Sequence, residues 1–222
     1  MRANSRRAIL CAAFGVLSMG FVPPKRDALP EIAGIYEAVG THPDGTTYTG
    51  KGTIRRLGGE RYEIVFDMPN GVFRALCLRL RDVLGCAWGA EKHLTVAVWR
   101  PTGAGIEGQW TADGDDAVGR ESGAGDPFAG TVVTNGVSLD GKAYLGDTRA
   151  LASGAFYRVD WRKPEYVGGW GLRVGSTLVG AFPSWRAGAA FYRIGPGGVV
   201  LTGEWMDPQQ SSVGLGTEVL TR

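Results

Sequence analysis

The chain has 222 residues, of which 44% are hydrophobic and 21% charged, which is ordinary for a globular protein of one or two domains. Its formal net charge is only +2, which excludes the strongly basic surface that binding to nucleic acid or anionic lipid requires. The 36 glycines follow no collagen period and are scattered between short apolar runs, as in the turns and bulges of an all-β chain.

Residues 1–20 have the three parts of an export signal. Three arginines precede an apolar run of 15 residues, 8–22, and the small residues Ser18 and Gly20 allow cleavage after Gly20. At about 1.5 Å per residue, this run falls short of the roughly 30 Å hydrocarbon core, so we expect no membrane span in the mature chain. A linker at 21–30 completes the predicted N-terminal region.

The hexapeptide S-R-R-A-I-L at 5–10 resembles a twin-arginine export signal, and an ordinary secretory signal is the alternative. Either route predicts a protein of the periplasm or the extracellular space. Removal of the signal leaves 21 basic and 22 acidic residues, a net charge of −1. We therefore expect no nucleic-acid partner.

Residues 31–126 form the first of two predicted β units. Tyr62, Ile64 and Phe66 recur with the period of two that buries one face of a strand, and turn residues recur every eight to twelve positions. No segment after the signal has a sustained helical pattern, so we predict an all-β fold with little or no helix. Such strands form an antiparallel meander that closes into a barrel or pairs as a sandwich. The predicted strands are approximately 34–40, 46–57, 61–68, 72–81, 83–90, 94–101, 105–112 and 117–122.

Two cysteines remain after the signal, Cys77 and Cys86. A two-residue turn at Arg81 and Asp82 places them opposite each other in a hairpin, at a separation that suits a disulfide. An oxidising compartment would let this bond form, and two reduced, packed thiols are the alternative. Because the closed loop is short, we expect the bond to pin the register of the hairpin more than to hold the fold together.

The second unit, 127–222, repeats the first at an offset of 93 to 96 residues. The motif D-G-x-x-Y-x-G occurs at 44–50 and at 140–146, and G-x-W occurs at 108–110 and at 203–205. This constant order indicates an internal duplication, whose two units could form separate barrels or one shared sheet system. The positions that are aromatic in both units are Tyr48/Tyr144, Tyr62/Tyr157, Phe66/Trp161, Trp88/Phe182, Trp99/Tyr192 and Trp110/Trp205.

The shared aromatic residues are expected to fill the core of each unit, since each ring buries about 150–250 Å². The functional alternative is an aromatic-lined barrel mouth that holds an apolar or sugar-like ligand. Trp170 and Trp185 have no match in the first unit and are expected to be exposed. They are candidate ligand-binding residues, together with the shared pair Trp99 and Tyr192.

No catalytic residue, metal site or cofactor is predicted. Neither His42 nor His93 has a counterpart in the other unit, and no G-x-S-x-G motif accompanies them. The chain has no P-loop or C-x-x-C motif, and the cysteine spacing does not suit a metal site. The aspartate-rich run at 113–116 lacks the calcium-loop pattern, so it is interpreted as a hairpin tip.

The D-G-x-x-Y-x-G motif, the two G-x-W motifs and G-x-G-T-E at 214–218 together resemble a group of bacterial exported β-repeat proteins, some labelled fibronectin-binding-like. The resemblance covers nearly all of the mature chain and implies a fold more than a ligand. We therefore expect non-enzymatic binding in the cell envelope or periplasm, to an extracellular protein or matrix component or to a small apolar ligand. The alternatives are a structural envelope module without a dedicated ligand and a cell-envelope hydrolase.

Overall fold

The computed structural model describes residues 29–90, 93–208 and 214–222. The predicted export signal, the twin-arginine motif and most of the linker lie outside the described residues. In the described part the predicted fold class is confirmed, because the chain consists of sixteen β-strands and one 3₁₀ turn, η1 (Pro196–Gly198).

The strand boundaries follow the period-two pattern and the turn residues closely. The first eight strands are β1 (Gly34–Thr41), β2 (Thr47–Gly58), β3 (Arg61–Met68), β4 (Gly71–Leu80), β5 (Val83–Trp88), β6 (Thr95–Thr102), β7 (Gly105–Ala112) and β8 (Gly119–Gly123). The second eight are β9 (Val132–Val137), β10 (Ala143–Ser153), β11 (Phe156–Lys163), β12 (Glu165–Val174), β13 (Thr177–Phe182), β14 (Gly188–Ile194), β15 (Val200–Met206) and β16 (Gly216–Thr221).

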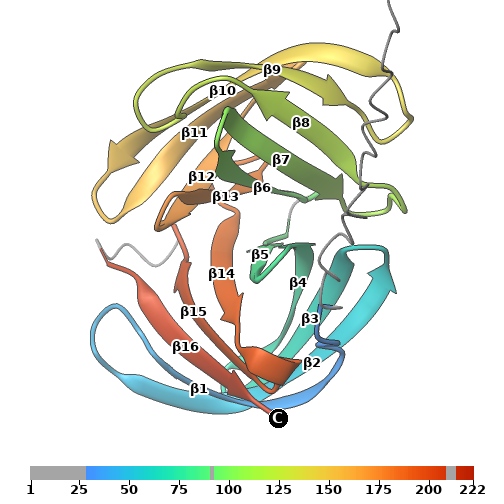
Figure 1. Cartoon of the computed structure of the whole chain (residues 1–222). Coiled ribbons are helices and arrows are strands. Elements are labelled where there is room, and N and C mark those ends of the chain that lie inside the picture. The colour runs from blue at the N-terminus through green and yellow to red at the C-terminus, as the bar shows by residue number, and fades with distance from the viewer. Residues whose placement is uncertain (1–28, 91–92, 209–213) are drawn as a thin grey trace, which may run out of the picture.

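The strands close into two antiparallel barrels of eight strands each, so neither sheet leaves an unpaired edge. One barrel, here called the first barrel, consists of β1–β5 and β14–β16. The second barrel consists of β6–β13. Figure 1 shows the second barrel above the first, with the chain passing between them after β5 and again after β13.

Each barrel combines strands from both sequence units. By the offset of the repeat, β1–β8 correspond in order to β9–β16. The first barrel therefore contains β1–β5 of the first unit and β14–β16 of the second unit. The second barrel contains β9–β13 of the second unit and β6–β8 of the first unit. The seams are equivalent, since Cys86 faces Ala190 where β5 meets β14, and Gly180 faces Ala97 where β13 meets β6. The two units have exchanged their last three strands.

The predicted unit boundary at 126/127 separates the sequence repeats but not the barrels. It falls between β8 and β9, which are hydrogen-bonded neighbours within the second barrel. Because the chain crosses between the barrels twice, the barrels are parts of one body rather than two consecutive domains.

The barrels pack together through strands that are apolar on both faces, which explains the continuous hydrophobic runs of β4, β5 and β6. Leu78 and Val98, from different barrels, belong to one buried cluster between them. The two sheets come close together at Gly85, because a Cβ atom there would lie 2.6 Å from the Val98 side chain. A residue without a side chain lets the two sheets touch at this point.

The predicted hairpin register and disulfide are confirmed. Leu80 pairs with Val83 around the turn, and Cys77 pairs with Cys86, where the two cysteines are joined by a disulfide. Arg81 takes up a positive φ of 60° in the two-residue turn, as the right-handed twist of the hairpin requires.

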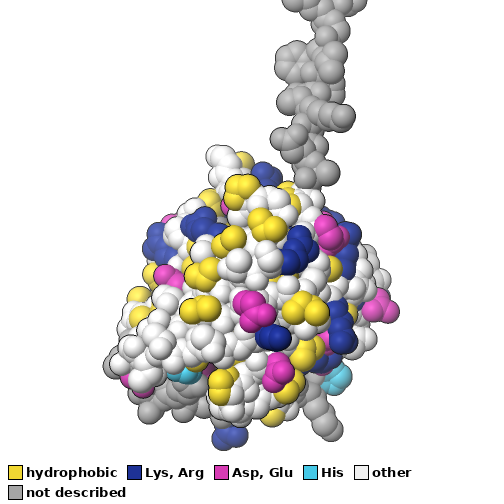
Figure 2. All heavy atoms as spheres, turned by 90° about the horizontal axis from the view of Figure 1, so that it is seen from below, with side chains coloured by type: hydrophobic (Ala, Val, Ile, Leu, Met, Phe, Trp, Pro, Cys, Tyr) yellow, Lys and Arg dark blue, Asp and Glu magenta, His cyan; other side chains and the backbone are white. Residues whose placement is uncertain are grey.

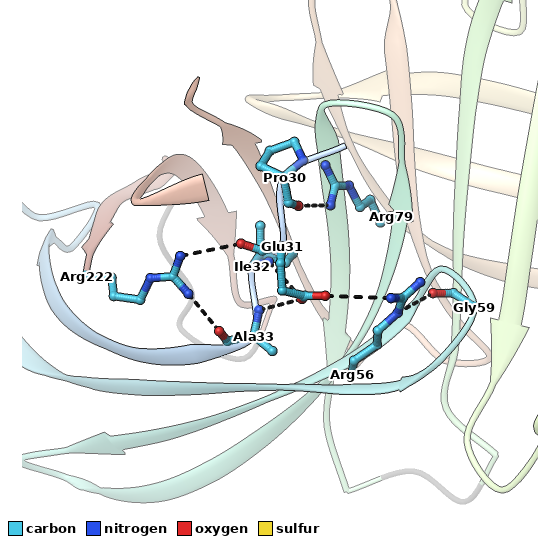
Figure 3. Close-up of polar contacts among 8 residues, drawn as sticks. All are labelled: Pro30, Glu31, Ile32, Ala33, Arg56, Gly59, Arg79 and Arg222. Atoms are coloured by element: carbon cyan, nitrogen blue, oxygen red, sulfur yellow. Dashed lines mark hydrogen bonds and ion pairs between the residues drawn. The ribbon is translucent and has the colours of Figure 1, made fainter. Parts of the chain in front are cut away.

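One end of the first barrel is closed by the segment 30–33, which precedes β1 (Figure 3). Ile32 is fully buried, and Arg79 and Arg222 donate hydrogen bonds to the carbonyls of Pro30 and Ala33 at 2.6 and 2.8 Å. Phe128 is the counterpart of Ile32 in the second barrel, where it packs on Tyr157. Phe128 precedes β9 as Ile32 precedes β1, so the two residues occupy corresponding ends of the two barrels.

Candidate ligand cavity in the first barrel

The opposite end of the first barrel contains a cavity of about 400 Å³. Every lining strand contributes from the end of the barrel that lies away from the closing segment. The walls are mainly aromatic and apolar: Tyr48, Phe66, Met68, Phe73, Ala75, Cys86, Trp88, Ala190, Tyr192 and Trp205. The polar lining residues are His42, Asn70, Asp207 and Glu218.

A chain of hydrogen bonds lines one wall of this cavity. The indole N–H of Trp205 donates to the Tyr48 hydroxyl at 2.8 Å, and that hydroxyl donates to Oε1 of Glu218 at 3.0 Å. The Tyr192 hydroxyl donates to Oε2 of the same carboxyl at 2.6 Å. Glu218 is 4% exposed, and this burial raises the pKa of its carboxyl above the ordinary value, although both tyrosine hydrogen bonds act to lower it.

The exchange of strands assembles this network. Tyr48 comes from β2 of the first unit, whereas Tyr192, Trp205 and Glu218 come from β14, β15 and β16 of the second. These residues lie up to 170 positions apart in the sequence and meet only because the three last strands of the second unit complete the first barrel.

The second barrel contains the same network with one more donor. Trp110 donates to the Tyr144 hydroxyl at 3.0 Å, and Tyr144 donates to Oε1 of Glu121 at 2.6 Å. The indole N–H groups of Trp99 and Trp161 also donate to this carboxylate, at 2.8 and 2.9 Å. Among the described residues, Glu121 therefore accepts three hydrogen bonds and Glu218 accepts two, because Phe66 stands where the second barrel has Trp161.

Large side chains fill the space of the second barrel that corresponds to the cavity. Trp161 and Phe182 are fully buried, with ring centroids 4.9 Å apart. Phe182 can lie inward because Gly180 has no side chain, since a Cβ atom there would lie 2.7 Å from the phenyl ring. The first barrel has Cys86 at this position and keeps the corresponding ring, Trp88, half-buried beside the cavity.

A lysine completes the filling of the second barrel. The Nζ atom of Lys163 lies 3.2 Å from the ring centroid of Trp110 and 4.4 Å from that of Trp161. Burial lowers the pKa of Lys163 to about 8, while the nearby negative charges of Glu121 and Asp115 oppose this change.

Polar side chains also line the cavity. The imidazole of His42 packs on Tyr48 and Trp205, with ring centroids 4.6 and 5.5 Å away. Asn70 and Asp207 line the same cavity, and among its described lining residues there is no serine, lysine or arginine. The cavity therefore combines aromatic walls with two carboxyl groups.

The four predicted ligand-binding residues do not form one site. Tyr192 lines the cavity and binds Glu218. Its counterpart, Trp99, is 1% exposed and binds Glu121 in the filled second barrel. Trp170 and Trp185 lie on the second barrel, where the Trp170 indole donates to the Trp185 carbonyl at 2.7 Å and the rings pack edge to face. Trp185 is 40% exposed, and Trp170 is half-buried.

Glu218 is not among the predicted site residues, although the sequence contains a signal for it. Glu121 and Glu218 lie at matching positions of β8 and β16, at an offset of 97 residues. A carboxyl that occurs in both units, in strands otherwise rich in aromatic contacts, indicates a buried acceptor shared by the two barrels.

The fold and the cavity together define a double β-barrel protein with one hollow and one filled barrel. No protein-family model, curated protein or solved structure matches this chain. Within residues 29–90, 93–208 and 214–222, no group of three or more His, Cys, Asp or Glu side chains could hold a metal ion. No helix in that part is long and apolar enough to cross a membrane.

Proposed function

We propose that this protein is a non-enzymatic binding protein that holds a small, largely apolar ligand in the first barrel. The proposal rests on a difference between the two barrels, which have the same strand arrangement. The second barrel fills its open end with Trp161, Phe182 and Lys163, whereas the first leaves about 400 Å³ at the same place. Ligand pockets typically enclose about 300–1,000 Å³ and combine apolar walls with a few polar groups, so this cavity suits a small molecule.

The lining supports a ligand with one polar group. Phe66, Phe73 and Trp88 present apolar rings to the cavity, whereas Tyr48 and Glu218 offer hydrogen-bonding groups. A ligand that fills the apolar part and hydrogen-bonds to this pair would be oriented as well as held.

We also propose that the protein acts in the periplasm or outside the cell. The disulfide between Cys77 and Cys86 is typical of an oxidising compartment, and the predicted signal at 1–20 agrees with export. A macromolecular partner has weaker support. On the face drawn in Figure 2, hydrophobic side chains are interspersed with charged ones, as on an ordinary protein surface.

The proposal is tested with a neutral hydrophobic probe, N-phenyl-1-naphthylamine, whose fluorescence rises in an apolar site. We expect the wild-type chain to bind it, and Phe66→Trp to weaken binding by about tenfold or more, equivalent to about 1.4 kcal/mol. The substitution introduces the larger ring that fills the second barrel. The matched control, Trp161→Phe, changes the equivalent position of the second barrel and should leave probe binding unchanged.

Thermal unfolding of each variant checks that it is folded before binding is measured. A wild-type chain that leaves the probe fluorescence unchanged would contradict the proposal. Equal losses in Phe66→Trp and Trp161→Phe would contradict it as well, because the probe would then not be bound in the first barrel.

A further inference from the structure

In the second barrel, a lysine side chain places a positive charge at the open end. The Lys163 ammonium lies over the Trp110 ring at 3.2 Å from the centroid and beside that of Trp161, and the charge of Glu121 acts on it. An aromatic face and a carboxylate offset part of the hydration that this cation loses on burial. Burial still lowers the pKa of Lys163, but only to about 8, so the amine is mostly protonated at pH 7.

The first barrel keeps this setting but lacks the cation. Trp205 takes the place of Trp110 and Glu218 takes the place of Glu121, and in both barrels a tyrosine hydroxyl accepts from the indole and donates to the carboxylate. Met68 occupies the position of Lys163 at the end of β3. A neutral thioether therefore stands where the second barrel has a positive charge.

From the described residues, Glu218 receives fewer hydrogen bonds than its counterpart Glu121 does. A carboxylate can accept about four hydrogen bonds, and Glu218 receives two where Glu121 receives three. The missing donor is the indole N–H of Trp161, which Phe66 lacks. This position borders the cavity, because both Phe66 and Glu218 line it.

The charge of the lining favours the same kind of ligand. Glu218 and Asp207 are the acidic residues that line the cavity, and no lysine or arginine is found among its described lining residues. Glu218 is buried, and its donors among the described residues are the neutral hydroxyls of Tyr48 and Tyr192. Burying a carboxylate is costly, and a cationic ligand would reduce that cost.

We propose that the ligand of the first barrel is a protonated amine attached to an apolar group, with its ammonium over Trp205 and beside Glu218. This inference rests on the proposed function and specifies the class of ligand. The N–H group donates to Glu218 in place of the missing indole, and the apolar group lies against Phe66 and Trp88. The ammonium of the ligand would thus take the place in the first barrel that the Lys163 ammonium has in the second.

A matched pair of compounds tests this proposal. Protonated 3-phenylpropylamine and neutral 3-phenylpropanol have nearly the same shape, and their binding is measured by calorimetry at pH 7. We expect the amine to bind the wild-type chain at least about tenfold more tightly than the alcohol, in line with a desolvated cation–π contact and a charged hydrogen bond.

Met68→Lys is the most informative variant, because it gives the first barrel its own ammonium. It should remove the preference for the amine, whereas the control Met68→Leu should retain it. Glu218→Gln should also reduce the preference, and it provides a second test if Met68→Lys does not fold. Circular dichroism and thermal unfolding establish which variants are folded.

The outcomes separate this inference from the proposed function. If the alcohol and N-phenyl-1-naphthylamine bind and the amine binds no better than the alcohol, the inference is wrong and the proposed function stands. If none of the three compounds binds, both fail. Equal behaviour of Met68→Lys and Met68→Leu would overturn the inference, because loss of the methionine rather than gain of charge would then explain the result.

Discussion

The two barrels share strand order, register and a buried Trp–Tyr–Glu network, yet one is hollow at its open end and the other is filled. The difference arises at a few corresponding positions: Phe66/Trp161, Met68/Lys163, Cys86/Gly180 and Trp88/Phe182. None of these changes alters the pairing of the strands. The same closed barrel can therefore form whether its open end is filled by side chains or left as a cavity. The volume and charge of a few side chains decide which barrel has a binding site.

The largest expected effect is that of truncating the ring that fills the second barrel. Trp161→Ala should lower the free energy of unfolding by about 3–5 kcal/mol, because it leaves a buried void and removes a donor from Glu121. Phe66→Ala should cost at least about 1 kcal/mol less, since this ring already borders a cavity. Urea unfolding of both variants measures the difference. Equal losses of unfolding free energy would show that the Phe66 ring contributes as much to stability as the Trp161 ring.

A smaller contrast is expected between the two buried carboxyl groups. Glu121→Gln should cost about 2–3 kcal/mol, because either orientation of the amide NH₂ faces an indole N–H that can only donate. Glu218→Gln should cost about 1 kcal/mol, since its partners are tyrosine hydroxyls that can turn and accept. Chemical denaturation of the pair of variants tests this order, and the reverse order would refute it.

The disulfide is specific to the first barrel, because Gly171 and Gly180 occupy the equivalent positions of the second. Cys77→Ala with Cys86→Ala should lower the unfolding free energy by about 2 kcal/mol, as expected for a short closed loop, and should retain the β spectrum. Dithiothreitol should produce a similar loss in the wild-type chain and none in the double variant. Complete unfolding on reduction would show that the bond is required for the fold.

The last contrast is the pH dependence that Lys163 gives to the stability of the second barrel. Its pKa in the folded chain is about 8, below the ordinary 10.5, so between these values the unfolded chain binds more protons. The contribution of Lys163 to the free energy of unfolding therefore increases as the pH rises from about 8 to 10.5. Comparing denaturation of the wild-type chain and Lys163→Met across this range isolates the contribution. Identical pH profiles would show that the ammonium loses little hydration in the folded chain.

Much of the fold follows from local patterns. The alternation at Tyr62, Ile64 and Phe66 defines β3, and the Arg81–Asp82 turn places Cys77 opposite Cys86. Turn chemistry and side-chain alternation act over a few residues, so a single sequence carries them directly.

The candidate site was predicted only in part. Tyr192 lines the cavity, but the sequence gives no reason to separate it from Trp99, which occupies the equivalent position in the filled barrel. The distinction depends on neighbours such as Phe66 and Met68, which reach the cavity from another strand. Whether an aromatic ring fills a core or lines a pocket is decided by the volume around it, and that volume is a property of the packed barrel.

By itself, the sequence determined the all-β class, the positions of the strands, the cysteine hairpin and the duplication. Only the tertiary structure decided that the units exchange their last three strands and that one barrel remains open. The reason is that both copies carry the same strand pattern, so β5 can pair with β6 or with its counterpart β14 through similar local contacts. The choice between these partners depends on long-range packing between the barrels, which no short stretch of sequence encodes.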